Sequence, residues 1–329
     1  MRFLFIAWVA GGLVGGPALA ETNQVASGNP ATRAVEPSAV NAVLTEAQQL
    51  QKVMDNDDAA QGEVDQWIRE NEEFEAKGVG TPPGELKRRI QTRMAEVGKG
   101  YEDFLQRYPN NVKARIAYAS FLGDTKDEES AETQLEKALA LDTNNPAIYN
   151  NLANIYGHIG SVKKAFEYYA RAIKLNPIEP VYYHNLGTTV YLFRPDAEEY
   201  YGISEDQVFA KAFQLYSNAM RLDPENFPLA SDVAQTYYGI RPLRTEPALQ
   251  AWTNALHLAH DEIEREGVYI HFARIKLLAG RFGEAQKHLD AITNEMYMEL
   301  KHRIQRNLDE AERQAHRTNA PPLKTGNKG

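Results

Sequence analysis

The chain has 329 residues, with 36 Lys and Arg against 45 Asp and Glu, and its formal net charge is −9. This acidic balance argues against binding to nucleic acid over a broad surface, which depends on clustered Lys and Arg, and favours basic or neutral partners. Because the sequence contains no cysteine, it excludes disulfides, thiolate metal sites and a lipid anchor on cysteine. The length suffices for one or two domains, which must be held together by packing alone.

Residues 1–20 have the pattern of a secretory signal peptide. Arg2 precedes a short apolar run, and Ala18, Leu19 and Ala20 form an A-x-A cleavage site. A membrane anchor is the alternative, but the run is short and rich in glycine, and no second apolar segment of about 18 residues follows it. We therefore expect cleavage, a periplasmic or secreted mature protein, and no stable membrane insertion.

Residues 21–38 are rich in Ala, Ser, Asn and Pro and are expected to be a flexible linker. A helical N-terminal extension is predicted over 39–108. It begins with 39–54, where apolar residues recur at the 3-4 spacing of an amphipathic helix. The acidic residues of 55–58 then favour a helix-capping turn. A calcium loop is the alternative there, but Ala60 stands where such a loop requires glycine.

The remainder of the extension is predicted to contain two further helices. The first is acidic and covers 62–77, and the glycines and prolines of 78–84 end it. The second is longer and covers 86–108, where apolar residues again recur at helical spacing before Pro109.

The clearest pattern lies in residues 146–179. Apolar and small residues fall at helical spacing on both sides of a break at Gly160, and a proline closes the second helix: Tyr149, Leu152, Ala153, Tyr156, then Ala165, Tyr169, Ala172 and Pro177. The template reappears when the register is shifted by about 34 residues in either direction, which is the period of tetratricopeptide repeats. The pattern predicts a helical hairpin that is repeated along the chain.

The chain therefore resembles the tetratricopeptide repeat family over residues 112–292, most closely over 111–226. We assign repeat units near 112–145, 146–179, 180–226, 227–260 and 266–293, followed by a capping helix over 294–317 and a disordered tail over 318–329. The resemblance implies an all-α fold, a right-handed α-solenoid of stacked hairpins. Alanine or glycine at each helix crossing would let the two backbones approach closely.

In this family the first helix of each hairpin lines a concave groove that binds peptides or helices of partner proteins. The resemblance implies these groove positions, unit by unit: Lys113, Ile116, Ala117, Ser120; Asn150, Asn151, Asn154, His158; His184, Asn185, Thr188, Tyr191; and Ser231, Asp232, Gln235, Tyr238. Because Lys113 is the one obvious cation among them, we do not expect a clamp for an acidic C-terminus.

Asn151 and Asn185 occupy equivalent positions in successive units. Each amide offers a donor and an acceptor that could pair with a peptide backbone, so an asparagine ladder is one interpretation. The other interpretation is that these residues are polar only because the surface is solvated.

The third unit carries about 13 extra residues within the segment 191–209, and long insertions in compact domains are often functional. Tyr191, Arg194, Tyr200 and Tyr201 are of the residue types enriched at binding hot spots. Alternatively the insertion folds back over an apolar edge, which the tendency of aromatic side chains to be buried favours. The candidate partner-binding residues are Asn150, Asn151, Asn154, His158, His184, Asn185, Thr188, Tyr191, Arg194, Tyr200, Tyr201 and Gln235.

An enzymatic site is the main alternative. His257 and His260 lie three residues apart, as if on one helix face, with Asp261 and Glu264 close by. Zinc hydrolases place two histidines four residues apart with a glutamate between them, so we favour capping or surface histidines here. The sequence also lacks a nucleophile elbow and a nucleotide-binding loop. We expect no metal, no cofactor and no catalytic residue.

The sequence thus predicts a non-enzymatic extracytoplasmic adaptor or scaffold that binds a protein or peptide ligand in its groove, in cell-envelope assembly. The alternatives are an accessory envelope hydrolase or transferase that uses the histidines, and a self-assembling structural protein. The identity of the partner and the oligomeric state do not follow from the sequence.

Overall fold

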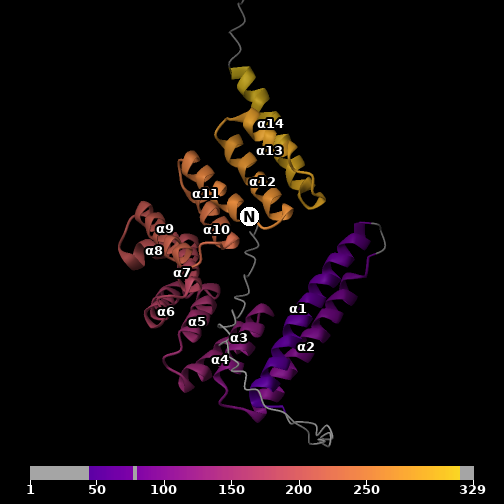
Figure 1. The fold of residues 1–329 in the computed structure, drawn as a ribbon, viewed down its shortest axis with the longest axis vertical. Coiled ribbons are helices and arrows are strands. Elements are labelled where there is room, and N and C mark those ends of the chain that lie inside the picture. Colours follow the sequence, from indigo (N-terminus) through magenta and orange to yellow (C-terminus); the bar gives the residue numbers. More distant parts are fainter. Residues whose placement is uncertain (1–43, 77–79, 319–329) are drawn as a thin grey trace, which may run out of the picture. The chain divides into compact units, whose positions relative to one another are not determined.

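A computed structural model of the chain describes residues 44–76 and 80–318, and in these residues all regular structure is helical (Figure 1). The expected signal peptide, linker and most of the tail lie outside the described residues. The chain divides into two compact units, Met1–Ser161 and Val162–Gly329, which are described separately below. None of the described helices is long and apolar enough to cross a membrane.

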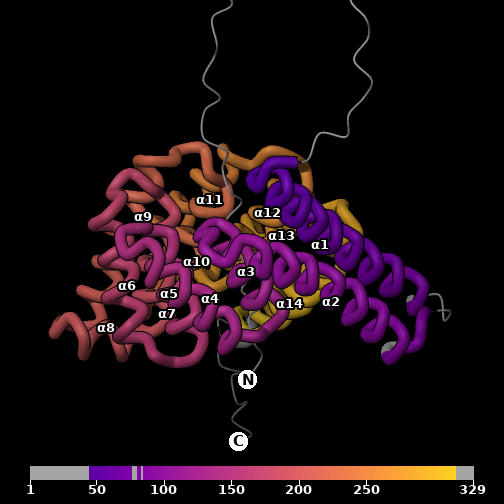
Figure 2. Tube along the Cα trace, turned by 90° about the horizontal axis from the view of Figure 1, so that it is seen from below, coloured from indigo at the N-terminus to yellow at the C-terminus, as the bar shows by residue number. Residues whose placement is uncertain are grey.

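The first unit contains two neighbouring helical hairpins and a further helix. Its helices are α1 (Glu46–Ala76), α2 (Pro83–Arg107), α3 (Val112–Asp124), α4 (Glu128–Leu141) and α5 (Pro146–His158). The long helices α1 and α2 pack side by side, and α3 packs against both α2 and α4 (Figures 1 and 2). Asn145, whose side chain accepts a hydrogen bond from the backbone of Ala147, caps α5, and Pro146 occupies the first helical position, where its missing N–H has no cost.

The turn predicted at residues 55–58 does not exist, because α1 runs through it without a break. The reason is a set of partners, most of them on α2, that the local sequence does not reveal. Buried Asp57 accepts hydrogen bonds from the Tyr101 hydroxyl at 2.8 Å and from Gln61 Nε2 at 3.0 Å. Arg93 Nη2 donates to Asn56 Oδ1 at 3.0 Å. These contacts hold the polar side chains in the helix, so Glu46–Ala76 is one helix where parts of two, over 39–54 and 62–77, were predicted.

Asp124, the last residue of α3, is an unfavourable feature of this unit. Burial is the main reason that its pKa is raised to about 6, and the charge of Asp57 raises it further. A carboxylate at the C-terminal end of a helix also opposes the helix dipole. Among the described residues, its side chain has no hydrogen-bond partner. The ionised form of Asp124 therefore destabilises the folded unit.

This feature gives a prediction with a defined pH window. An unfolded Asp has a pKa of about 3.9, so the folded unit binds more protons than the unfolded chain up to about pH 6, and its stability falls as the pH rises through that window. We expect Asp124→Asn to increase the free energy of unfolding by about 1 kcal/mol at pH 7.5, a value reduced for partial exposure. The gain should vanish below about pH 4.

Urea denaturation at about pH 7.5 and about pH 4 measures this difference. The matched control is Asp103→Asn, because Asp103 is exposed on α2 of the same unit. A gain for Asp124→Asn that is equal at both pH values would contradict the prediction.

The second unit consists of three hairpins with additional helices. Its elements are α6 (Val162–Leu175), α7 (Pro180–Leu192), α8 (Arg194–Tyr201), α9 (Glu205–Leu222), α10 (Phe227–Thr236), η1 (Tyr237–Gly239), α11 (Thr245–Leu258), α12 (Glu262–Leu278), α13 (Phe282–Asp290), η2 (Glu295–Tyr297) and α14 (Met298–Thr318). Helix α7 pairs with α9, α10 with α11, and α12 with α13. These are the helical hairpins of a tetratricopeptide-type all-α fold.

Small residues set the spacing of these pairs. A Cβ atom added to Gly187 of α7 would lie only 3.0 Å from the ring of Tyr216 on α9, so glycine is what allows this close approach. In the next two hairpins, alanines at the crossings and large apolar side chains between them form one core cluster: Ala230, Ala234, Ala248, Trp252, Ala255, Val268, Phe272 and Ile275.

The insertion of the third repeat forms α8 and folds back on α6. Phe166 of α6 is fully buried, and its ring lies 5.3 Å from that of Tyr200 and 5.4 Å from that of Tyr201. Lys163 of α6 forms an ion pair with Glu199 of α8 at 2.5 Å. These contacts favour the interpretation that the insertion covers an apolar edge.

Helix α14 packs on α12 and α13 through a narrow apolar stripe. Ile304 and Leu308 are buried, and Ile304 joins a cluster with Ile270, Leu289 and other residues of the fifth repeat. Met296, which falls within the capping helix predicted over 294–317, lies in η2 before α14 and is 65% exposed.

Candidate functional site

Polar side chains of three successive first helices in the second unit lie in two groups, each linked by contacts between neighbouring elements. We call the two groups together the polar wall; it consists of His184, Thr188, Asp232, Gln235, Tyr238, His271 and Arg274. On each of α7, α10 and α12, the two wall residues are three or four positions apart. Tyr238 lies in the short η1 turn after α10. Such spacing places residues on one helix face.

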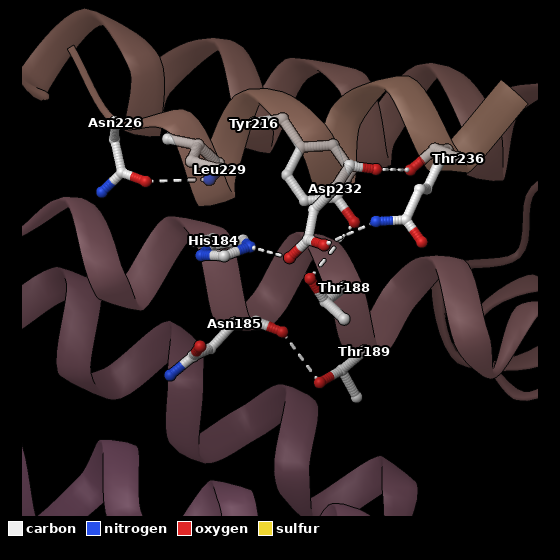
Figure 3. A network of polar contacts seen from close by, with 10 residues as sticks. His184, Asn185, Thr188, Thr189, Tyr216, Asn226, Leu229, Asp232 and Thr236 are labelled. Carbon is white, nitrogen blue, oxygen red and sulfur yellow. Dashed lines mark hydrogen bonds and ion pairs between the residues drawn. The ribbon is translucent and has the colours of Figure 1, made fainter. Parts of the chain in front are cut away.

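The first part of the wall links α7 to α10 (Figure 3). His184 Nε2 lies 2.8 Å from Asp232 Oδ2, and Gln235 Nε2 donates to the other carboxylate oxygen, Oδ1, at 3.4 Å. The Asp232 side chain is 39% exposed, whereas that of His184 is 16% exposed. The carboxylate is thus fixed from two sides but still accessible to an external hydrogen-bond donor.

A buried tyrosine supports this part of the wall from behind. The hydroxyl of Tyr216, a residue that is 1% exposed, lies 3.2 Å from Thr188 Oγ1 and also forms a hydrogen bond with Thr236 (Figure 3). Burial raises the pKa of Tyr216 far above its usual value, so the phenol stays neutral. This hydroxyl ties α9 to both α7 and α10, and we infer that it limits movement of the wall.

The second part of the wall links η1 to α12. The Tyr238 hydroxyl lies 3.1 Å from His271 Nδ1, and the Arg274 guanidinium lies over the Tyr238 ring at 4.8 Å. The His271 ring stacks on buried Trp252 with a centroid distance of 3.9 Å and an interplanar angle of 9°. Burial, with a further contribution from the charge of Arg274, lowers the pKa of His271 to about 3, so this imidazole is neutral.

His271 and Arg274 are absent from the candidate residues proposed above. A signal for them exists in the sequence, since Phe272 and Ala273 of the fifth repeat stand where Leu152 and Ala153 stand in the second. His271 and Arg274 are therefore the counterparts of Asn151 and Asn154. The groove positions had been followed only to the fourth repeat, because the fifth matches the template weakly.

The candidate residues of α5 belong to the first unit. Asn150 is 6% exposed, and its Nδ2 donates to Asn151 Oδ1 at 3.2 Å. Asn151 and Asn154 are half-buried, and His158 is exposed at the last turn of the helix. Because Asn185 lies on α7 of the second unit, the proposed ladder between Asn151 and Asn185 stays a prediction.

The candidate residues of the insertion are largely engaged within the second unit. Arg194 Nη1 donates to the Tyr191 carbonyl at 2.7 Å, and its guanidinium lies 5.1 Å from the Tyr191 ring centre. Tyr191 packs so closely against Gly239 that a Cβ there would lie 2.8 Å from its ring. Tyr201 is half-buried under Lys211, whose Nζ lies 4.1 Å from the ring centre. Tyr200 is the more accessible of the two tyrosines, at 37% exposed.

The histidine pair considered as an enzymatic site does not share a helix face. Helix α11 ends at Leu258, so His257 lies in its last turn and His260 lies beyond it. His260 Nδ1 is 3.0 Å from Glu264 Oε2, and Asp261 is the N-cap of α12, where its side chain accepts from the Glu264 N–H. His260 is thus an exposed residue of a helix start. In the part of the chain that the structure describes, no three His, Cys, Asp or Glu residues are grouped as a metal site would require.

Residues 146–179 match the family model of the tetratricopeptide repeat. Among curated proteins, the photosystem I assembly protein Ycf3 of Rippkaea orientalis (strain PCC 8801 / RF-1) is 29% identical over 133 residues, which cover 36% of this chain and 74% of that protein.

Two solved structures show the same fold. The type IV pilus biogenesis factor PilW is similar with a TM-score of 0.53 and 14% identity, over 67% of this chain and 94% of PilW. A structure of IFIT1 with m7Gppp-AAAA is similar with a TM-score of 0.53 and 18% identity, over 68% of this chain and 50% of IFIT1. At these identities the likeness extends to the fold alone.

Proposed function

Because this chain is a tetratricopeptide repeat protein, we propose that it acts as a non-enzymatic adaptor or scaffold that binds a peptide or protein segment along the polar wall. The observation that carries the proposal is the wall itself. Its donors and acceptors come from three successive hairpins, and hydrogen bonds and ring contacts between neighbouring helices connect them. An extended backbone needs such a series of fixed polar groups, because each of its peptide units carries a donor and an acceptor.

The geometry of His184 and Asp232 supports binding rather than catalysis. A histidine paired with a carboxylate can serve as a general base when a hydroxyl nucleophile bonds to the imidazole. Here the neighbouring hydroxyl, Thr188 Oγ1, lies 3.2 Å from the Tyr216 hydroxyl instead. In this proposal His184 therefore holds the Asp232 carboxylate in place, where the carboxylate can accept a hydrogen bond from the ligand.

We further propose that the protein acts outside the cytoplasm, in the assembly of a cell-envelope structure. The pattern of residues 1–20 supports export, and the curated relative is named as an assembly protein. The acidic net charge of −9 supports a protein ligand over a nucleic acid.

Selection of short random peptides by phage display on the purified protein tests the binding proposal. We expect a family of related peptides to be enriched and to bind the protein as synthetic peptides in fluorescence anisotropy. Failure to enrich any peptide family would contradict the proposed function.

Changing Asn151 and Asn185 together to alanine should weaken binding of the selected peptide about tenfold, because each amide would contribute one hydrogen bond to its backbone. Helicity should not change, and the melting temperature should fall only slightly, because Asn151 Oδ1 accepts a hydrogen bond from the buried Asn150 amide. Gln214→Ala is the matched control, because Gln214 is exposed on α9, outside the wall. If affinity is unchanged in the double variant, the asparagine ladder is wrong and the residues of the polar wall hold the peptide without it.

A further inference from the structure

Arg274 is an exposed cation on α12 that forms no ion pair within residues 44–76 and 80–318. Elsewhere in the second unit, Arg194, Arg265 and Arg281 each lie within ion-pair distance of a glutamate. For Arg274 the structure shows no such carboxylate in the residues it describes. Its guanidinium instead lies over the Tyr238 ring at 4.8 Å. The charge of Arg274 is therefore available to a ligand.

The ring beneath Arg274 is held by contacts that lead into the core. The ring beneath its guanidinium belongs to Tyr238, whose hydroxyl is 3.1 Å from His271 Nδ1. His271 in turn lies flat on Trp252, a side chain that is 1% exposed and packed in the core. A guanidinium that is held in position loses less conformational entropy when it binds a ligand.

His271 adds a second donor beside this cation. A neutral imidazole carries a proton on one ring nitrogen and accepts at the other. When the Tyr238 hydroxyl donates to Nδ1, the proton is on Nε2. In that tautomer, the planar guanidinium fork of Arg274 and the N–H of His271 are both groups that bind carboxylates.

We propose that Arg274, together with His271, forms a subsite for the carboxylate of an Asp or Glu side chain in the segment bound along the polar wall. This inference rests on the proposed function and names the chemistry of its ligand. A C-terminal carboxylate is the other source, but its capture relies on free backbone N–H groups in a nest. Arg274 and His271 lie inside α12, where the backbone N–H groups are already bonded within the helix.

The test uses the peptides selected by phage display. On the wild-type protein we expect one position of the selected family to be enriched in Asp or Glu. A synthetic peptide with Gln or Asn at that position should bind the wild-type protein about tenfold more weakly, the loss expected for a hydrogen-bonded charge pair. Arg274→Gln should bind the acidic and the neutral peptide equally, so that the two changes are not additive.

Control variants and peptides complete the test. Arg303→Gln, at an exposed position on α14, should bind as the wild type does, and Arg274→Lys should retain part of the preference because it keeps the charge but loses the fork. Peptides with an amidated C-terminus should bind as well as those with a free one. Binding only by the free C-terminus would overturn the side-chain assignment.

The outcomes also separate this inference from the proposed function. If peptides are enriched without an acidic position, or if Arg274→Gln keeps the acidic preference, the subsite is wrong and the binding function stands. If no peptide family is enriched, the proposed function fails and the subsite fails with it.

Discussion

Replacing Trp252 with alanine is expected to lower the free energy of unfolding of the second unit by about 3–5 kcal/mol, the usual cost of removing a large aromatic side chain from a core. Trp252 is 1% exposed and packs in a cluster with Val268 and Phe272. It also carries the stacked His271 ring. The variant therefore leaves a cavity beneath the second part of the polar wall.

Urea denaturation followed by circular dichroism measures this loss. Trp252→Phe is the matched control, because it keeps an aromatic ring and removes a buried indole N–H that has no hydrogen-bond partner in the described chain. We expect the phenylalanine variant to lose clearly less stability than the alanine variant. A loss below about 1 kcal/mol for Trp252→Ala would show that this side chain does not anchor the core.

The second large effect is expected at Gly187, where alanine should destabilise the protein although it favours helices. In a helix interior, Gly to Ala normally stabilises by up to about 1 kcal/mol. Here the new Cβ would lie 3.0 Å from the Tyr216 ring and 3.3 Å from Leu215 Cβ, and overpacking of this kind costs about 1–3 kcal/mol. We expect a net loss of about 1–2 kcal/mol.

Gly283→Ala in α13 is the control for this substitution, since a Cβ there would meet no atom within 4 Å. The melting temperature of the Gly283→Ala variant should be unchanged or slightly higher than that of the wild type. The position of Tyr216 affects the wall through its hydrogen bond to Thr188, so Gly187→Ala should also weaken binding of the selected peptides. A Gly187→Ala protein as stable as the wild type would mean that α7 and α9 do not need the close approach.

The hairpins could be predicted from the sequence because their signals are local. Asn145 and Pro146 begin α5, and Glu179 and Pro180 begin α7, each through a cap and a proline at the first helical position. The continuous α1 could not be predicted in this way. Asp57 stays helical because Tyr101, 44 residues further along the chain, donates a hydrogen bond to it.

In the candidate site, too, local features could be predicted from the sequence and long-range contacts could not. The repeat register places His184 and Asp232 on first helices, but their pairing joins residues 48 positions apart, with no local signal. The residue types in the insertion were compatible with binding and with burial, and burial was favoured, but the contacts of Tyr200 and Tyr201 with Phe166 depend on how α8 folds back. His271 and Arg274 were missed because the groove positions were not carried into the fifth repeat, which matches the template most weakly.

Photo-crosslinking of the selected peptide tests binding along the polar wall most directly. A photoreactive residue would replace Gln235 on the wall in one protein and Gln214 in another. Gln214 is exposed, whereas Ala212, two residues earlier, is buried. The Gln214 side chain therefore lies on the side of α9 that faces away from the core. We expect the peptide to be crosslinked by the residue at position 235 and not by the one at position 214. Crosslinking at position 214 alone would contradict binding along the wall.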